Sequence, residues 1–200
     1  LIGNPVTGKP SFVFIYGYEA DGCTISGEGI IDANGHAFVE RKDKYYVTGN
    51  FYPRPTTIYI ENSNHITVKD VTVRDAPFWT LHPAGCDDVL IQNIEFNNGD
   101  DNVAVKCGRD NDGRTTAIPS SGIVIRNCHF KGLHAVVLGS EMSAGVENVF
   151  IENCTYDGYC KRGLYIKSNP DRGGFIRNIF CNNCEFGEVE DLIFFTSMYA

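Results

Sequence analysis

Several features are scarce or missing in this 200-residue sequence, and each excludes a class of protein. No run of about 18 apolar residues occurs, so no membrane-spanning helix is encoded, and no basic segment leads into an apolar stretch as in a secretory signal. Helical periodicity is absent almost everywhere, and 21 glycines against 2 methionines indicate many turns and few long helices. Positive charge is also scarce: a formal net charge of −8 argues against nucleic acid as the main partner.

What the chain does contain is enough for a packed core. Hydrophobic residues make up 42% and charged residues 21%, which argues against disorder. Eight cysteines permit disulfides, but a chain of this size does not depend on them. Cys181 and Cys184 form one C-x-x-C pair without a second pair at zinc-finger spacing. We therefore expect no metal site at these cysteines.

A short phrase of β-favouring residues followed by a polar residue recurs along the chain. Its copies begin at Ile66, Val89, Ile123, Val149 and Ile179, and Cys23-Thr24-Ile25 looks like an earlier one. The intervals are 23, 34, 26 and 30 residues, and the longest contains a polar loop insertion at residues 110–120. A repeat this short cannot bury its apolar face alone, whereas coil stacked upon coil buries it.

The repeat predicts an all-β fold, a parallel β-helix that forms one partial domain over residues 1–200. Neither end offers a capping element, and open sheet edges favour aggregation, so we expect the natural protein to be longer. The repeat also places three Asn-Cys pairs at equivalent positions of successive coils, at 127–128, 153–154 and 183–184. We interpret the cysteines as small buried hydrophobes and the asparagines as an amide ladder at a bend.

Stacking also turns residues that are distant in sequence into neighbours. The second strands of the repeats are aligned on four residues predicted to face inward: Trp79, Val103, Val136 and Leu164. The same alignment predicts an outward column of His82, Lys106, Gly139 and Lys167. A third column joins Asp101, His134 and Arg162 at one strand edge. Either a functional cluster or a surface polar ladder accounts for this third column.

Asp100 and Asp101 follow an Asn-Asn-Gly turn at residues 97–99. Two adjacent carboxylates repel each other, and burial would raise the pKa of one of them, as a general acid requires. Adjacent strand residues normally point to opposite faces, but the turn offers a way for both to reach one cleft. An Asx-rich turn with solvated aspartates is the alternative interpretation.

Several segments, in the right order, resemble glycoside hydrolase family 28, the polygalacturonases. Residues 98–106 (NGDDNVAVK) resemble its G-D-D-x-I-A-I-K segment, and residues 133–143 (LHAVVLGSEMS) resemble its G-H-G segment with the following G-S-E-M-S. Residues 162–167 (RGLYIK) resemble its R-G-x-R-I-K segment. Residues 54–59 (RPTTIY) and 78–83 (FWTLHP) look like its earlier coils, and the similarity runs from about Phe14 to Ala200.

The resemblance implies a right-handed parallel β-helix of the pectin lyase-like type and a secreted or periplasmic monomer. It implies inverting hydrolysis of α-1,4-galacturonosyl bonds in pectin or a related acidic polysaccharide, without a metal or another cofactor. Asp100 would be the general acid, Asp101 would hold and deprotonate water, and His134 would tune their protonation. Substrate contacts are assigned to Lys167, Tyr165, Arg162, Lys106 and His82.

Three departures from the family pattern stand out. No N-T-D segment, which carries a further water-holding aspartate, precedes the aspartate pair, so one whole coil is missing. Tyr165 stands where the family has a substrate-binding arginine, and tyrosine cannot make a charged bidentate contact with a uronate. Ala135 replaces the second glycine of G-H-G.

Two other functions stay open at this point. A non-catalytic carbohydrate-binding β-helix would bind without turnover, and the missing coil favours it. A polysaccharide lyase on the same fold would use a basic residue, for which Lys161, Arg162 and Lys167 are available. Lyases usually hold calcium with several carboxylates, and the sequence shows no clear oxygen-ligand set for it.

Overall fold

The computed structural model describes residues 7–38 and 54–199. The larger sheet contains β1 (Val13–Tyr18), β3 (Ile30–Asp32), β4 (Thr56–Glu61), β6 (Thr72–Arg74), β7 (Leu81–Ala84), β9 (Glu95–Val105), β11 (His129–Leu138), β13 (Thr155–Tyr156), β14 (Cys160–Lys167), β16 (Glu185–Phe186) and β17 (Val189–Thr196). The smaller sheet contains β2 (Thr24–Ser26), β5 (Asn64–Lys69), β8 (Asp87–Gln92), β10 (Ser121–Arg126), β12 (Val146–Glu152) and β15 (Ile176–Asn182).

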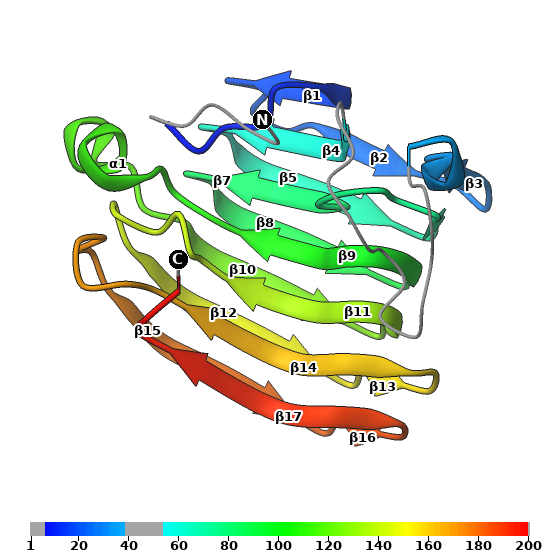
Figure 1. Ribbon diagram of the computed structural model, residues 1–200. Coiled ribbons are helices and arrows are strands. Elements are labelled where there is room, and N and C mark those ends of the chain that lie inside the picture. The colour runs from blue at the N-terminus through cyan, green and yellow to red at the C-terminus, as the bar shows by residue number, and fades with distance from the viewer. Residues whose placement is uncertain (1–6, 39–53, 200) are drawn as a thin grey trace.

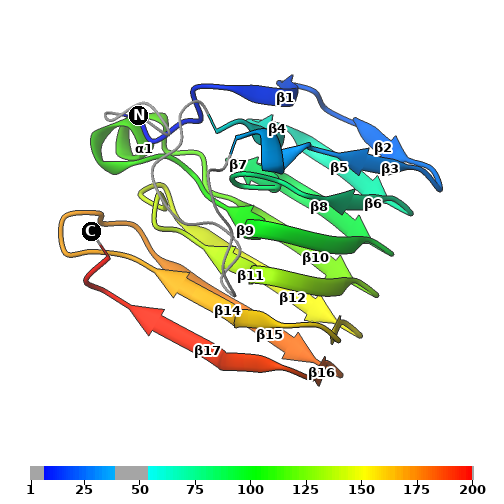
Figure 2. The same cartoon turned by 45° about the vertical axis from the view of Figure 1, so that its right-hand side comes forward.

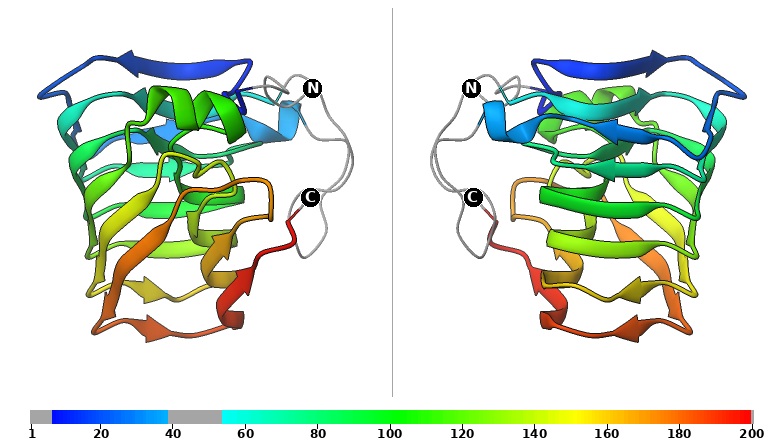
Figure 3. Two further views of the ribbon diagram at one scale, coloured as in Figure 1. Left: turned by 90° about the vertical axis from the view of Figure 1, so that its left-hand side faces the viewer. Right: turned by 90° about the vertical axis from the view of Figure 1, so that its right-hand side faces the viewer.

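All pairings in both sheets are parallel, and the chain winds from one sheet to the other as a right-handed β-helix (Figure 1). Figure 2 shows the smaller sheet behind the larger one. In Figure 3 the coils lie one above another in sequence order, from β1 to β17. The predicted fold is thus confirmed. Within the described residues, no helix is long and apolar enough to cross a membrane.

The repeat phrases pair in the predicted register. Val89 lies opposite both Ile66 and Ile123, and Ile123 lies opposite Val149, which in turn pairs with Ile179. The earlier copy at residues 23–25 also pairs as predicted, because Thr24 and Ile25 lie opposite Thr67 and Val68. Apolar side chains of both sheets fill the interior of the coils, and most of them are fully buried. Stacking, rather than any single coil, therefore builds the core.

The predicted asparagine ladder is present in part at one bend. Asn127 donates to Asn93 at 3.2 Å and Asn183 donates to Asn153 at 2.7 Å. All four have φ between 51° and 53°, a left-handed conformation that asparagine tolerates better than most residues. Beside them, Cys128 and Cys154 are buried and Cys184 is partly buried, and all three are free thiols.

Two predictions about this part of the fold need correction. The insertion after Lys106 is not only loop: it contains a short helix, α1 (Asp110–Thr116), at the edge of the stack in Figure 1. The alignment on Trp79 is wrong by two residues, because Leu81 is the residue opposite Val103. Trp79 precedes β7 and does not face inward as predicted: its ring packs against His82 and Lys106, because the alternation of faces holds only within a strand.

Candidate active site

The predicted column of Asp101, His134 and Arg162 is formed by consecutive coils. In β9, β11 and β14 these residues are direct cross-strand partners, and Asp191 of β17 continues the column. The imidazole Nδ1 of His134 lies 2.7 Å from Oδ1 of Asp101, and its Nε2 lies 3.3 Å from Nη1 of Arg162. The column therefore joins the three side chains into one hydrogen-bonded group.

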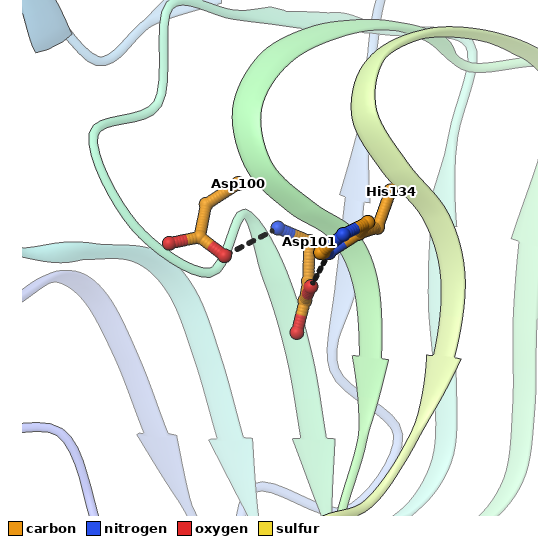
Figure 4. Close-up of side chains that lie close together, drawn as sticks. All are labelled: Asp100, Asp101 and His134. Atoms are coloured by element: carbon orange, nitrogen blue, oxygen red, sulfur yellow. Dashed lines mark hydrogen bonds and ion pairs between the residues drawn. The ribbon is translucent and has the colours of Figure 1, made fainter. Parts of the chain in front are cut away.

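An extra residue in β9 brings Asp100 beside this group. Between Gly132 and His134 of β11 the register shifts, so that three steps along β9 match two steps along β11. This bulge breaks the alternation of faces that would otherwise separate adjacent side chains. Figure 4 shows the result: Oδ1 of Asp100 accepts the backbone N–H of Asp101 at 2.8 Å, and His134 lies on the other side of Asp101.

Two buried asparagines hold the bulge in shape. The side-chain amide of Asn98 donates to Asn102 at 2.7 Å, and its oxygen accepts the backbone N–H of Ala76 at 2.9 Å. Asn102 then donates to the backbone oxygens of Lys131 and His134. The two side chains thus satisfy backbone groups at the corner where the coil turns into the sheet. They belong to the N-N-G-D-D-N run noted in the sequence.

Asp101 is a buried carboxylate with strong partners. Its side chain is 1% exposed, and Nζ of Lys167 donates to Oδ2 at 3.1 Å while His134 contacts Oδ1. Burial alone would raise the pKa of Asp101, but Lys167 and His134 outweigh it and hold that pKa well below its usual range. In turn, burial alone would lower the pKa of Lys167, but the nearby Asp101 carboxylate outweighs it and raises that pKa. Asp101 is therefore ionised and Lys167 charged.

Asp100 has the opposite electrostatic character. Its side chain is 18% exposed, and its nearest cationic partner is Nη1 of Arg54 at 3.4 Å. Burial and the adjacent charge of Asp101 raise the pKa of Asp100 above the ordinary value, while Arg54 acts in the other direction. Two neighbouring carboxylates are thus driven apart in pKa, one toward the protonated form and one toward the ionised form.

Arg162, Tyr165 and Lys167 form the next part of the site. The guanidinium of Arg162 lies 4.4 Å from the Tyr165 ring centre, which is also 5.1 Å from His134. Nζ of Lys167 lies 4.7 Å from the Tyr165 ring centre and 5.0 Å from that of Tyr199. Tyr165 is 5% exposed, so it offers an edge to a ligand rather than an open stacking face.

Lys106 and His82 lie farther along the same strands. Nζ of Lys106 donates to Gly139 O at 2.6 Å, contacts Glu141, and sits 4.0 Å above the Trp79 ring. Burial alone would raise the pKa of Glu141, but Lys106 lowers it to about 2. The predicted column of His82 with Lys106 is wrong, because Ala84 pairs with Lys106. His82 is one residue past Leu81 and is 2% exposed, with its ring 4.6 Å from Tyr59.

Among the residues that the structure describes, no third carboxylate stands next to Asp101 on the N-terminal side. The Leu81–Val103 pair places Trp79 there, and the N–H of Thr80 donates to the Asp101 carbonyl at 2.9 Å. The stack closes directly over the position of the absent N-T-D segment, so the described residues supply no water-holding aspartate from that coil.

Asp100, Asp101 and His134 also form the one group of described residues with metal-ligand character. One ligand atom from each lies within 4.8 Å of the others. Both oxygens of Asp101 already contact cationic or hydrogen-bonding partners, Lys167 and His134. Such a donor set suits an internal ion-pair network better than a divalent cation, which prefers several free oxygens.

Sequence reasoning missed three residues that the structure brings to the site. Arg54 reaches Asp100 from the segment before β4, and Glu141 neutralises Lys106. Tyr199 reaches Lys167 from the segment after β17. Only the match of residues 54–59 and of G-S-E-M-S to family segments pointed toward the first two, and it carried no role for either side chain.

Comparisons with known proteins agree with this fold. A probable polygalacturonase of Vitis vinifera is 26% identical over 216 residues, covering 93% of this chain and 43% of its own length. A polygalacturonase of Ralstonia solanacearum is 30% identical over 121 residues, covering 59% of this chain and 21% of its own. The crystal structure of a hyperthermoactive exopolygalacturonase from Thermotoga maritima aligns with a TM-score of 0.55 and 27% identity, covering 74% of this chain and 43% of that one.

This chain spans less than half the length of these relatives. The sequence profile described as glycosyl hydrolases family 28 matches residues 6–98 and again residues 80–200. Residues 80–98 fall within both matches, which together cover nearly the whole chain. The chain therefore belongs to glycosyl hydrolases family 28.

Proposed function

We propose that this chain hydrolyses α-1,4 bonds between galacturonic acid units of pectin or of a related acidic polysaccharide, with inversion. The observation that carries the proposal is the unequal contact of two adjacent carboxyl groups: Asp101 contacts Lys167 and His134, whereas Asp100 lies 3.4 Å from Arg54 and accepts the Asp101 N–H. These contacts lower the pKa of Asp101, while burial and the charge of Asp101 raise that of Asp100. Glycoside hydrolysis needs one protonated and one ionised carboxyl group. Asp100 supplies the acid and Asp101 the base.

Asp100 donates its proton to the glycosidic oxygen while the bond from that oxygen to C1 breaks. A water molecule attacks C1 from the opposite face and gives its proton to Asp101. The products are a new reducing end of inverted configuration and a free hydroxyl on the leaving sugar, and solvent returns the proton from Asp101 to Asp100.

Water attack is favoured over direct attack by Asp101. One oxygen of Asp100 lies within 4.8 Å of one oxygen of Asp101, whereas the carboxyl groups of inverting enzymes stand roughly 6.5–9.5 Å apart. Asp101 is however only 1% exposed, and its oxygens contact Lys167 and His134, which argues against a bond from Asp101 to a sugar carbon. An NMR measurement of the first-formed anomer tests this step: retention of configuration contradicts it.

We assign substrate contacts to the cationic and aromatic residues around the pair. Lys167 would bind a uronate carboxylate, because its charge is held beside the reacting position. Arg162, Tyr165, Lys106 and His82 would contact the neighbouring sugar units. The substrate places the working compartment outside the cytoplasm, so we propose a secreted or periplasmic monomer.

The absent third carboxylate favours a second candidate, a carbohydrate-binding β-helix without turnover. A reducing-end assay on polygalacturonate, with absorbance followed at 235 nm, separates the candidates. Hydrolysis predicts new reducing ends without an absorbance rise, and their loss in Asp100→Asn. A lyase would instead raise the absorbance through its unsaturated product. Folded protein that binds but does not turn over would favour the binding module.

A further inference from the structure

A small pocket with an unpaired histidine lies beside the proposed catalytic pair, toward the N-terminal coils. It is lined by Lys9, Tyr59, Glu61, His82, Lys106 and Glu141 among others, and the space inside it that water-sized groups can occupy is about 30 Å³. A site needs roughly 10–15 Å³ of such space to hold one water molecule. The pocket therefore has room for one or two hydroxyl-sized groups, while a sugar ring would have to remain at its mouth.

His82 is a polar side chain in the wall of this pocket that makes no hydrogen bond to the described residues. It is 2% exposed, and neither of its ring nitrogens has a hydrogen-bond partner among the described residues. Its ring packs 4.6 Å from that of Tyr59 and 4.8 Å, edge to face, from that of Trp79. Two orphaned polar atoms in a buried residue cost free energy unless a ligand or water satisfies them.

Both positive charges around His82 are paired within the protein. Lys9 forms an ion pair with Glu61, and Lys106 forms one with Glu141. Burial, and then the charge of Lys106, hold the pKa of His82 well below its ordinary value, so the imidazole is neutral. A neutral imidazole offers one donor and one acceptor, which is the complement of a hydroxyl group. The lining holds two lysines against the three acids Glu61, Asp112 and Glu141, so no positive charge is left over to attract a carboxylate.

We propose that His82 and the pocket around it bind one hydroxyl group of a sugar unit next to the cleaved bond. This inference rests on the proposed function and adds to it a subsite that recognises an uncharged group. Trp79 forms the aromatic wall between this subsite and the catalytic pair, since it contacts both His82 and Lys106. Recognition here complements the charged contact at Lys167.

The test uses Trp79 as a built-in reporter, because it is the only tryptophan of the chain. Tetragalacturonate is titrated into the Asp100→Asn protein, and the Trp79 fluorescence gives Kd without turnover. The same titration is run with His82→Phe and with His82→Gln added to that protein. Phenylalanine keeps the packing against Tyr59 and Trp79 but removes both polar atoms, whereas glutamine keeps a donor and an acceptor. His65→Phe, on an exposed histidine, is the matched control.

We expect Kd to rise about tenfold in His82→Phe, about what one hydrogen bond contributes, and less than about threefold in His82→Gln or His65→Phe. The ratio of Kd between His82→Phe and the parent should be the same at low and high salt, because the lost contact is uncharged. An unchanged Kd in His82→Phe would overturn this inference alone. An equal loss in both His82 variants would also overturn it, since packing would then explain the effect. Absence of binding by the parent would overturn the proposed function as well.

Discussion

At the scale of single residues, the site contains two identical carboxyl groups that have different neighbours. Asp100 and Asp101 are chemically identical and adjacent, yet Lys167 contacts only one of them closely. Burial raises the pKa of both carboxyl groups, and only Asp101 has partners strong enough to reverse that shift. A cation placed against one carboxylate is therefore sufficient to separate the two roles.

The pH profile should follow Asp100. Because its pKa is raised, Asp100 stays protonated above the ordinary range near pH 4, and kcat should fall as the pH rises through its folded pKa. Arg54 lowers that pKa, so Arg54→Met should shift the alkaline limb to higher pH. Arg177→Met, on an exposed ion pair with Glu147, is the control and should not shift it. A limb that stays in place in Arg54→Met would argue against Asp100 as the acid.

Lys167 should also support the fold. Lys167→Met leaves the Asp101 carboxylate without its cation, which we expect to lower the free energy of unfolding by about 3–5 kcal/mol in urea at neutral pH. The pKa of Asp101 is depressed in the fold, so its contribution is present above about pH 4 and is lost as the pH falls toward the folded value. In an Asp101→Asn background the same substitution should cost much less. Equal costs in both backgrounds would show that the pair is not coupled.

At the scale of the element, the bulge in β9 is what aims the two carboxylates. It depends on close backbone stacking between β9 and β11, where Gly132 has φ 110°. A Cβ on Gly132 would lie 1.8 Å from the carbonyl oxygen of Asn98. No side chain fits at that distance, so glycine is required by contact as well as by backbone conformation.

Gly132→Ala should therefore displace the bulge. We expect a stability loss of about 3 kcal/mol from the clash together with the unfavourable φ, and turnover reduced beyond what the stability loss explains. Thermal unfolding followed by circular dichroism, with kcat measured well below Tm, tests both effects. Gly29→Ala is the control, because its Cβ would meet nothing within 4 Å. Similar behaviour of the two variants would show that the close approach is unimportant.

At the scale of the whole molecule, each coil is stabilised by its two neighbours. Core residues of the central coils, such as Val103, Ile123 and Val136, are fully buried. The outer coils expose large apolar side chains, among them Phe14 in β1 and Phe195 in β17, each 66% exposed. Stability should therefore be graded along the stack rather than uniform.

Hydrogen exchange should report this gradient. Backbone amides of β9 and β11 should be the most protected, and those of β1, β2, β15 and β17 should exchange faster by at least about tenfold, because they have a neighbour on one side only. Peptide-resolved mass spectrometry at neutral pH measures it. Uniform protection from the first coil to the last would mean that the stack opens as a single cooperative unit.

The sequence by itself determined the β-helix, the register of the first strand in each repeat and the Asp101–His134–Arg162 column. In a stack of parallel strands, residues one repeat apart in the sequence become neighbours in space, so these three features follow from the spacing of the repeats. Only the tertiary structure decided the two-residue offset of Leu81 and the approach of Arg54 to Asp100. The physical reason is the same for both, because neither contact is encoded in the alternation of a strand. Trp79 precedes β7, where strand alternation does not apply, and Arg54 reaches the site from outside the repeat.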